Sequence, residues 1–270
     1  MLLPRRDGTL ACQARDTTRR VGRTFAIACR LLPRALRDDV YLLYLVFRTL
    51  DDLVDDRDPE ALARIDAVER WSRGGDAVSR ETEILASLAS RHSLPGGALR
   101  DFCRGMRDDL AGVPIETEAE LDAYCYRVAG TVGVVMAAML GTVGNADGQA
   151  AALGMAMQRT NILRDIDEDH DNGRIYLARE TVARFGGPEP GCRKALLRDQ
   201  IARADALYDV GIAGICRLRH GRRAIAAAAG MYREILRQIE REGYGRRAGR
   251  AVVPRRRKLL IAARRGVLPA

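Results

Sequence analysis

The sequence predicts an all-α protein, with one domain whose helices surround a central apolar cavity. Leu, Ala and Val dominate the 47% of residues that are apolar, and aromatic residues make up only 5%, which favours helices. Apolar residues recur at helical spacing through most of the chain, and no stretch alternates with the period of two typical of a half-buried strand. The 270 residues contain no internal repeat and no long linker, so a single domain is expected.

Prolines and glycines divide the chain into helical segments. Residues 1–15 are expected to be poorly ordered, residues 16–260 to form the domain, and residues 261–270 to be a basic tail. The expected helices are 16–32, 35–56, a helix from the turn at 58–59 to residue 71, 81–92, 98–110, the apolar segment 118–144, the helix that carries residues 158–169, 192–218 and 222–242.

A first acidic motif ends the second of these helices. Four carboxylates, at positions 51, 52, 55 and 56, follow a run of apolar residues, and Tyr44, Arg48, Asp51 and Asp55 fall on one helix face. Clustered carboxylates repel one another unless a cation lies among them. Their oxygens suit magnesium better than zinc, and magnesium usually arrives with a phosphorylated substrate. A solvated acidic helix end is the alternative interpretation of this motif on its own.

A second acidic motif follows more than a hundred residues later. Asn161, Asp165 and Asp169 are spaced four residues apart, which places them on one face of a helix, and Arg164 lies beside them. Two acidic ridges that face each other across a cavity, with divalent cations between them, would clamp a diphosphate. The pair of motifs therefore makes diphosphate chemistry the leading hypothesis.

The apolar segment between the motifs contains repeated glycines. Glycine inside a helix costs about 1 kcal/mol relative to alanine, so its repetition from Tyr124 to Met136 indicates either close helix packing or room for a ligand.

Charge and cysteine usage limit the cellular setting. The net charge is +9, and the segment 246–265 holds nine basic residues and no acid. This segment is either a solvated tail or a surface that attracts anionic lipid or diphosphate. Nucleic-acid binding is not expected, since no reading helix or aromatic platform is present. The six cysteines form no C-x-x-C pair, which is typical of reduced, buried cysteines in the cytosol. No secretion signal is evident, and no run of residues approaches the ~20 apolar residues of a membrane-spanning helix. We expect a cytoplasmic protein with peripheral membrane contact.

Five segments, in the same order, resemble the squalene/phytoene synthase family, whose members join two prenyl diphosphates through their first carbons. The most specific segment runs from Gln158 to Asp169 and is closed by Gly173-Arg-Ile-Tyr-Leu177. The others are Phe47-Arg-x-x-Asp-Asp-x-x-Asp55, Gly105-Met-x-x-Asp-Leu110, Tyr124-Cys-Tyr-x-Val-Ala-Gly-Thr-Val-Gly133, and Tyr232-x-x-Ile-Leu with Arg250. The resemblance implies an isoprenoid synthase fold whose two acidic motifs face each other at the cavity mouth.

The resemblance also implies a role for each matching residue. The implied catalytic residues are Tyr44, Arg48, Tyr124, Asn161 and Asp165. The implied magnesium ligands are Asp51, Asp55, Asn161, Asp165 and Asp169. Diphosphate oxygens would be bound by Arg48, Arg164, Arg174, Arg250 and Tyr232, the prenyl tails would contact Val128, Val132 and Gly133, and further substrate contacts would come from Thr24, Gln158 and Tyr176. One departure is Gly22-Arg-Thr-Phe25, where the family usually has Ser-x-Ser-Phe, because Gly22 lacks the first hydroxyl.

The expected reaction is the condensation of two geranylgeranyl diphosphates to phytoene through a cyclopropylcarbinyl diphosphate. Mg²⁺ is the expected metal, with Mn²⁺ as an alternative. Squalene, dehydrosqualene or presqualene diphosphate formation from farnesyl diphosphate, and prenyl transfer to an aromatic acceptor, are alternatives within catalysis. A non-catalytic lipid-binding protein is the alternative outside it. A requirement for NADPH and the oligomeric state stay open.

Overall fold

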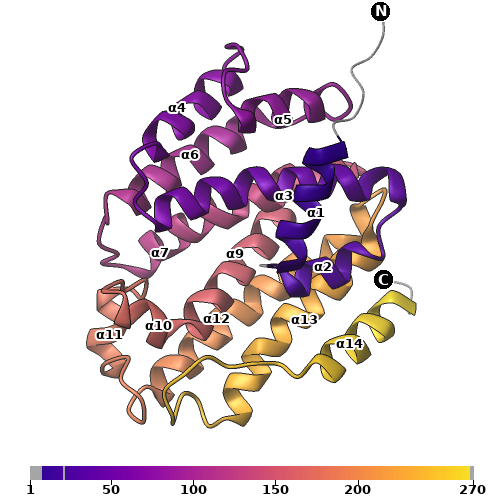
Figure 1. Cartoon of the computed structure of the whole chain (residues 1–270). Coiled ribbons are helices and arrows are strands. Elements are labelled where there is room, and N and C mark those ends of the chain that lie inside the picture. Colours follow the sequence, from indigo (N-terminus) through magenta and orange to yellow (C-terminus); the bar gives the residue numbers. More distant parts are fainter. Residues whose placement is uncertain (1–7, 21, 268–270) are drawn as a thin grey trace, which may run out of the picture.

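The protein is a bundle of α-helices, seen in a computed structural model that describes residues 8–20 and 22–267 (Figure 1). These ranges contain no strand and a single isolated bridge, between Thr142 and Leu218. The predicted all-α class is confirmed. The helices are α1 Gly8–Arg20, α2 Arg23–Cys29, α3 Arg34–Asp55, α4 Ala61–Ser72, α5 Arg80–Ala89, α6 Gly96–Leu110, α7 Glu118–Cys125, the π-helical turn η1 Tyr126–Gly130, α8 Thr131–Leu140, α9 Asp147–Arg164, α10 Ile166–Asp171, α11 Arg179–Phe185, α12 Lys194–Ala213, the 3-10 turn η2 Ile215–Arg217, α13 Arg222–Arg241 and α14 Arg255–Val267.

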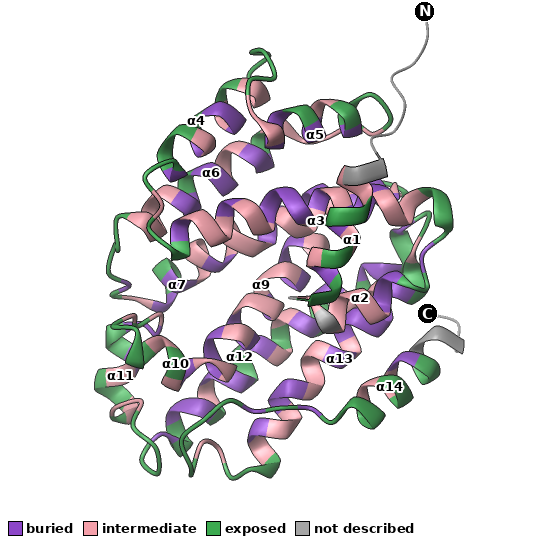
Figure 2. Ribbon diagram, viewed as in Figure 1, coloured by how far each residue is buried: buried purple, intermediate pink, exposed green. Residues whose placement is uncertain are grey.

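Helix α9 lies at the centre of the bundle and packs against α8, α12 and α13. Helices α4, α5 and α6 pack on one another and beside α3 (Figure 1). One cluster of buried apolar side chains joins α3 to α4, α5, α6 and α8, and a second joins α9 to α12 and α13. The buried residues form stripes along the inward faces of these helices, while their outer faces are exposed (Figure 2).

Helix α3 carries the first acidic motif at its C-terminal end. Pro33 is its N-cap, where proline is tolerated because the first N–H groups of a helix have no intrahelical acceptor. The helix then continues for 22 residues and ends at Asp55. Its carboxylates therefore meet the negative end of the helix dipole, where an anion is unfavourable unless a cation is nearby.

The N-terminal region differs from the prediction in two ways. Residues 8–15, expected to be poorly ordered, are helical in α1, which packs on α3 and buries Ala14. Residues 1–7 lie outside the described residues. The single helix expected over 16–32 is divided in two, because Gly22 leaves the helical conformation (φ −90°, ψ 48°). A Cβ atom at Gly22 would lie 2.8 Å from the Tyr44 hydroxyl, so only glycine allows this close approach.

The C-terminal boundary and the central apolar segment also differ from the prediction. The expected tail 261–270 begins inside α14, which packs on α13 and α2 as far as the described residues extend. In the described part of the chain, one stretch, Glu118–Leu140, is long and apolar enough to cross a membrane, which the sequence had not led us to expect. It comprises α7, η1 and α8 and packs against α6 and α9, so it is a helix of the bundle core.

Candidate active site

A cavity of about 800 Å³ lies inside the bundle. Side chains from α2, α3, α8, α9, α12 and α13 form its wall, together with the segment 250–258. Its volume falls within the ~300–1,000 Å³ typical of small-molecule sites. Most residues predicted to form the site line this cavity: Thr24, Tyr44, Arg48, Asp51, Val128, Val132, Gly133, Gln158, Asn161, Arg164, Tyr232 and Arg250. The others are outside its wall and belong to a polar cluster at its acidic end: Asp55, Tyr124, Asp165, Asp169, Arg174 and Tyr176.

The first acidic motif presents Asp51 to the cavity from the last turn of α3. The Nη1 atom of Arg48 donates to Asp51 Oδ2 at 2.8 Å, and its Nη2 atom pairs with Asp52. Tyr44 lies one turn earlier and stacks on Phe25, with ring centroids 5.3 Å apart. The three cavity-lining residues of the predicted stripe therefore do share one face of α3.

The second acidic motif is bent, and the prediction of one uninterrupted helix is wrong. Helix α9 ends at Arg164, Asp165 adopts φ −103° and ψ 11°, and α10 begins at the next residue. Arg164 donates two hydrogen bonds to Asp165, of 2.8 and 2.5 Å. Adjacent residues point in different directions on a regular helix, so this pair accompanies the bend. The Asp169 N–H still donates to the Asp165 carbonyl at 2.8 Å, which keeps the two acids close.

Two arginines from later segments each pair with one of the acidic motifs. Arg174 pairs with the carboxylate of Asp55, and its Nη2 atom donates to the Asp55 carbonyl at 3.0 Å. The Nε atom of Arg250 lies 2.8 Å from Asp165 Oδ1. Arg174 therefore joins the chain beyond α10 to the end of α3, and Arg250 joins the segment before α14 to the second motif.

Two tyrosines and an aspartate lie beside these pairs. Tyr124 and Tyr176 stack with centroids 5.4 Å apart, and both hydroxyls donate to Asp109 of α6, at 3.4 and 3.2 Å. Burial, followed by repulsion from Asp109, raises the pKa of both tyrosines, so they stay protonated. Tyr124, which the resemblance implies to be catalytic, is thus part of the polar cluster outside the cavity wall.

The carboxylates carry more negative charge than the nearby arginines balance. Burial, with repulsion from Asp55, Asp52 and Asp109, raises the pKa of Asp51 to about 7 despite Arg48. Burial, with repulsion from Asp165 and Glu168, likewise raises the pKa of Asp169 to about 7. Such shifts mark carboxylates that would gain from an added cation.

The donor set fits a hard divalent cation. All the acidic candidates are oxygen ligands, the type that magnesium prefers. The Oδ1 atom of Asn161 is buried and accepts no hydrogen bond, so a lone pair is available in the cavity wall. In the described ranges no three acidic, histidine or cysteine side chains converge as a metal site, and arginines pair with Asp51, Asp55 and Asp165. A cation bound among these carboxylates would compete with the arginines for their oxygens.

Gly133 of the apolar segment and Gly154 of α9 serve close helix packing. A Cβ atom at Gly133 would lie 2.3 Å from the Ala150 carbonyl oxygen, and one at Gly154 would lie 2.2 Å from the Ala129 carbonyl oxygen. Both glycines also line the cavity. At Gly133 the two explanations offered for the segment's glycines therefore apply together, since the backbones of η1 and α8 touch that of α9 and leave space on one side.

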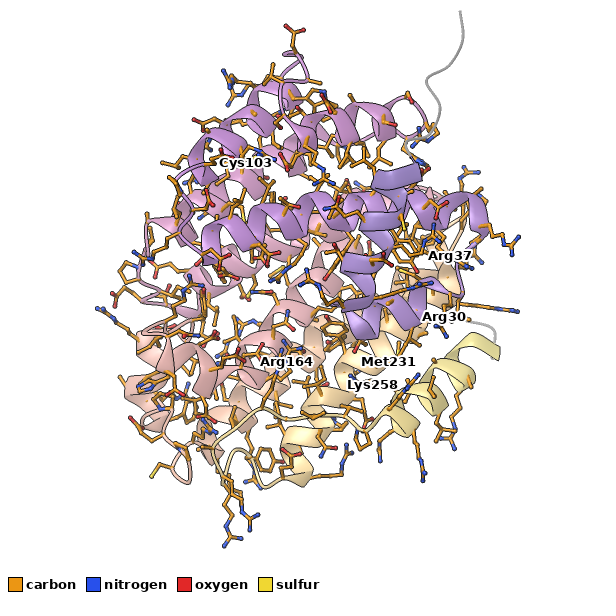
Figure 3. All side chains as sticks on the ribbon, viewed as in Figure 1. Arg30, Arg37, Cys103, Arg164, Met231 and Lys258 are labelled. Atoms are coloured by element: carbon orange, nitrogen blue, oxygen red, sulfur yellow. The ribbon has the colours of Figure 1, made fainter. Side chains whose placement is uncertain are left out.

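Two residues at the site had no predicted role. Asp109 is within the Gly105-Met-x-x-Asp109 segment, and its position one turn after Gly105 was the available signal. Lys258 of α14 lines the cavity, and its Nζ atom donates to Thr24 Oγ1 at 3.1 Å. Figure 3 labels Lys258 and Arg164, which approach the cavity from α14 and α9. The sequence placed Lys258 only within a basic run.

A helical bundle around an apolar cavity, with two acidic motifs that carry arginines at one end, defines a prenyltransferase of the isoprenoid synthase fold. The family model for squalene/phytoene synthases matches residues 18–257. The chain therefore belongs to the squalene/phytoene synthase family, and it is an enzyme. This family acts on prenyl diphosphates and generally depends on a divalent metal. The non-catalytic alternative is set aside.

Relatives and solved structures agree with this assignment. The chain is 40% identical over 240 residues to a phytoene synthase of Thermus thermophilus, which covers 83% of this chain and 82% of the relative. It is 34% identical to a 15-cis-phytoene synthase of Synechococcus elongatus, with 92% and 89% covered. The crystal structure of a dehydrosqualene synthase superposes with a TM-score of 0.87 at 26% identity, and 95% of each chain is covered. A squalene synthase of Alicyclobacillus acidocaldarius gives a TM-score of 0.77 at 25% identity, with 88% and 95% covered.

Proposed function

We propose that the protein condenses two molecules of geranylgeranyl diphosphate head to head into phytoene, with Mg²⁺ as the metal. The observation that carries the proposal is the cavity of about 800 Å³, which is apolar along α8 and α9 and bounded at one end by both acidic motifs. The choice of a twenty-carbon substrate rests on the phytoene synthases that are 34% and 40% identical to the chain.

Arginines supply the diphosphate contacts in this proposal. Arg48, Arg164 and Arg250 line the cavity, and each pairs with a carboxylate of an acidic motif. A guanidinium matches two phosphate oxygens with parallel hydrogen bonds, so a diphosphate competes well for these groups. Magnesium among the carboxylates would supply the positive charge that replaces the arginines there and stabilises the departing diphosphate.

The apolar wall protects the cation that forms when diphosphate leaves. Val128, Val132 and Met136 line the cavity beyond the charged end and exclude water from the allylic carbon. The double bond of the second substrate attacks this carbon, and loss of a proton closes the cyclopropane ring. Loss of the second diphosphate then permits rearrangement to the linear skeleton, and a second proton leaves as the central double bond forms. Two substrates thus give one hydrocarbon, two diphosphates and two protons.

Released diphosphate is the proton acceptor that the site favours. Burial, followed by interaction with Tyr232, raises the pKa of Tyr44 to about 12, so this phenol stays protonated at neutral pH. A protonated tyrosine donates a hydrogen bond but is a poor base. Tyr44 therefore orients the diphosphate or stabilises the cation, while the diphosphate oxygens accept the protons.

The product assay tests the proposal. Purified protein with Mg²⁺ is offered geranylgeranyl or farnesyl diphosphate, each with and without NADPH, and the hydrocarbons are extracted. We expect phytoene from the twenty-carbon substrate without NADPH. A thirty-carbon product formed only from farnesyl diphosphate would favour the alternative that the dehydrosqualene synthase structure supports. Consumption of prenyl diphosphate only when an aromatic acceptor is added would overturn the condensation.

We also propose that the enzyme works in the cytoplasm against an anionic membrane surface. Helix α14 exposes Leu259 and Leu260 between exposed arginines at 255, 256 and 264. This pattern is typical of a helix that lies on anionic lipid, and a hydrocarbon product needs a bilayer to leave the protein. Co-sedimentation with vesicles should require phosphatidylserine and decline with salt. Equal binding to neutral vesicles at every salt concentration would contradict the proposal.

A further inference from the structure

The segment that carries Arg250 into the cavity has no regular secondary structure. Helix α13 ends at Arg241 and α14 begins at Arg255, so residues 242–254 form an irregular connection. Positive φ angles occur at Gly243, Tyr244, Gly245 and Gly249. Such a segment places an arginine accurately only if other residues fix its backbone.

A buried arginine and an aspartate contact this backbone. Arg193, at the N-cap of α12, is 1% exposed. Its Nη1 and Nη2 atoms donate to the two carboxylate oxygens of Asp167 at 2.5 and 2.8 Å. The same guanidinium donates to the carbonyl oxygens of Gly245 at 3.2 Å, Arg247 at 3.4 Å and Pro188 at 2.9 Å. All five N–H donors of the guanidinium are therefore used.

Asp167 belongs to the second acidic motif and also contacts the backbone of the irregular segment 242–254. Its Oδ2 atom also accepts a hydrogen bond of 2.7 Å from the N–H of Gly249, the residue before Arg250. Asp165, two residues earlier, receives the side chain of Arg250 at 2.8 Å. One short stretch of α10 and its N-cap thus fixes both the backbone before Arg250 and the guanidinium itself.

We infer that Asp167 and Arg193 are positioning residues that hold Arg250 in place for the diphosphate. The inference rests on the proposed function, in which Arg250 binds diphosphate oxygens. Asp167 carries one of several negative charges in the motif, yet both of its oxygens face Arg193 and Gly249 rather than the cavity. Asp167 therefore acts through Arg250 and not as a metal ligand.

The glycines of the connection offer a matched test that leaves the charged groups unchanged. A Cβ atom at Gly245 would lie 2.1 Å from Arg193 Nε, so Gly245→Ala must displace the backbone from the guanidinium. A Cβ atom at Gly243 would approach no atom closer than 3.5 Å. The two glycines have φ angles of +67° and +82°, so Gly243→Ala carries comparable backbone strain without the clash.

The measurements are kcat and KM for geranylgeranyl diphosphate, and the Kd of inorganic diphosphate with Mg²⁺ by calorimetry. We expect Gly245→Ala to raise KM and Kd about tenfold, which corresponds to the loss of one charge-assisted hydrogen bond. Gly243→Ala should change both constants less than about twofold. Asp167→Asn should have the same effect as Gly245→Ala. In an Arg250→Ala background, Gly245→Ala should add nothing further, because its effect acts through that arginine.

Two results would overturn the inference. One is an equal loss in Gly243→Ala and Gly245→Ala, which would show backbone strain alone. The other is a full effect of Gly245→Ala in the Arg250→Ala background, which would show that the arginine is not the element held. If the unaltered protein consumes no prenyl diphosphate but its diphosphate affinity follows the expected order, the positioning role stands and the proposed function fails.

Discussion

Asp51→Asn should stabilise the metal-free protein above neutral pH while abolishing its activity. The pKa of Asp51 rises from 3.8 to about 7 in the folded state, so the folded protein holds this proton more tightly than the unfolded chain. The free energy of unfolding therefore falls as the pH rises from about 4 to about 7. Three pKa units correspond to ~4 kcal/mol. The side chain is 43% exposed, and solvent screening reduces the expected effect to ~1–2 kcal/mol.

Thermal unfolding in a chelator at about pH 4 and at pH 8 measures this effect. In a chain of this size, 1 kcal/mol shifts the Tm by about 2–4 °C, so the variant should melt about 2–8 °C above the unaltered protein at pH 8, and the difference should shrink as the pH falls toward 4. Arg48 keeps Asp52 as a partner in the variant. Asp76→Asn, at an exposed loop position, is the control and should change neither Tm. Equal pH slopes for the variant and the unaltered protein would refute the reasoning.

Three further predictions follow from the packing and the charges. In urea unfolding, Gly133→Ala should destabilise the fold by about 1–3 kcal/mol, because its Cβ atom would lie 2.3 Å from the Ala150 carbonyl. Gly148→Ala has open space around it and should increase the stability by about 0.4–1 kcal/mol. Equal effects of the two changes would contradict the packing argument. Arg159→Met should lower the free energy of unfolding by about 3–5 kcal/mol, because it removes the buried partner of Glu118 at 2.9 Å. Adding Glu118→Gln should recover part of this loss in calorimetry, and no recovery would contradict the charge argument. Asp169→Asn should lower kcat at saturating Mg²⁺ by about 10²–10³-fold, and a normal kcat would exclude a role in stabilising the leaving group.

Local patterns predicted the fold well where helices begin and end at strong breaks. Helix α3 follows Pro33 and α13 follows Gly221, and both lie within a residue or two of the predicted bounds. The sequence failed at two breaks inside expected helices. Gly22 leaves the helical conformation at a point where a Cβ atom would lie 2.8 Å from the Tyr44 hydroxyl, and Asp165 leaves it while paired with Arg164.

The candidate site was predictable as a set of residues but not as a set of contacts. Most residues named from the motifs line the cavity, because helical spacing placed them on inward faces. The sequence could not show that Arg174 reaches Asp55, since the two are separated by 119 positions. The same holds for Arg193, whose partners Asp167 and Gly245 lie 26 and 52 positions away and whose buried position gives no local pattern.

The ratio of diphosphate released to hydrocarbon formed tests the proposed condensation most directly. The protein is incubated with Mg²⁺ and geranylgeranyl diphosphate as the sole organic substrate, and both products are measured over time. The proposed reaction predicts two diphosphates for each forty-carbon hydrocarbon, with no acceptor and no NADPH present. Release of diphosphate without a forty-carbon product, or release only after a second organic substrate is added, would contradict it.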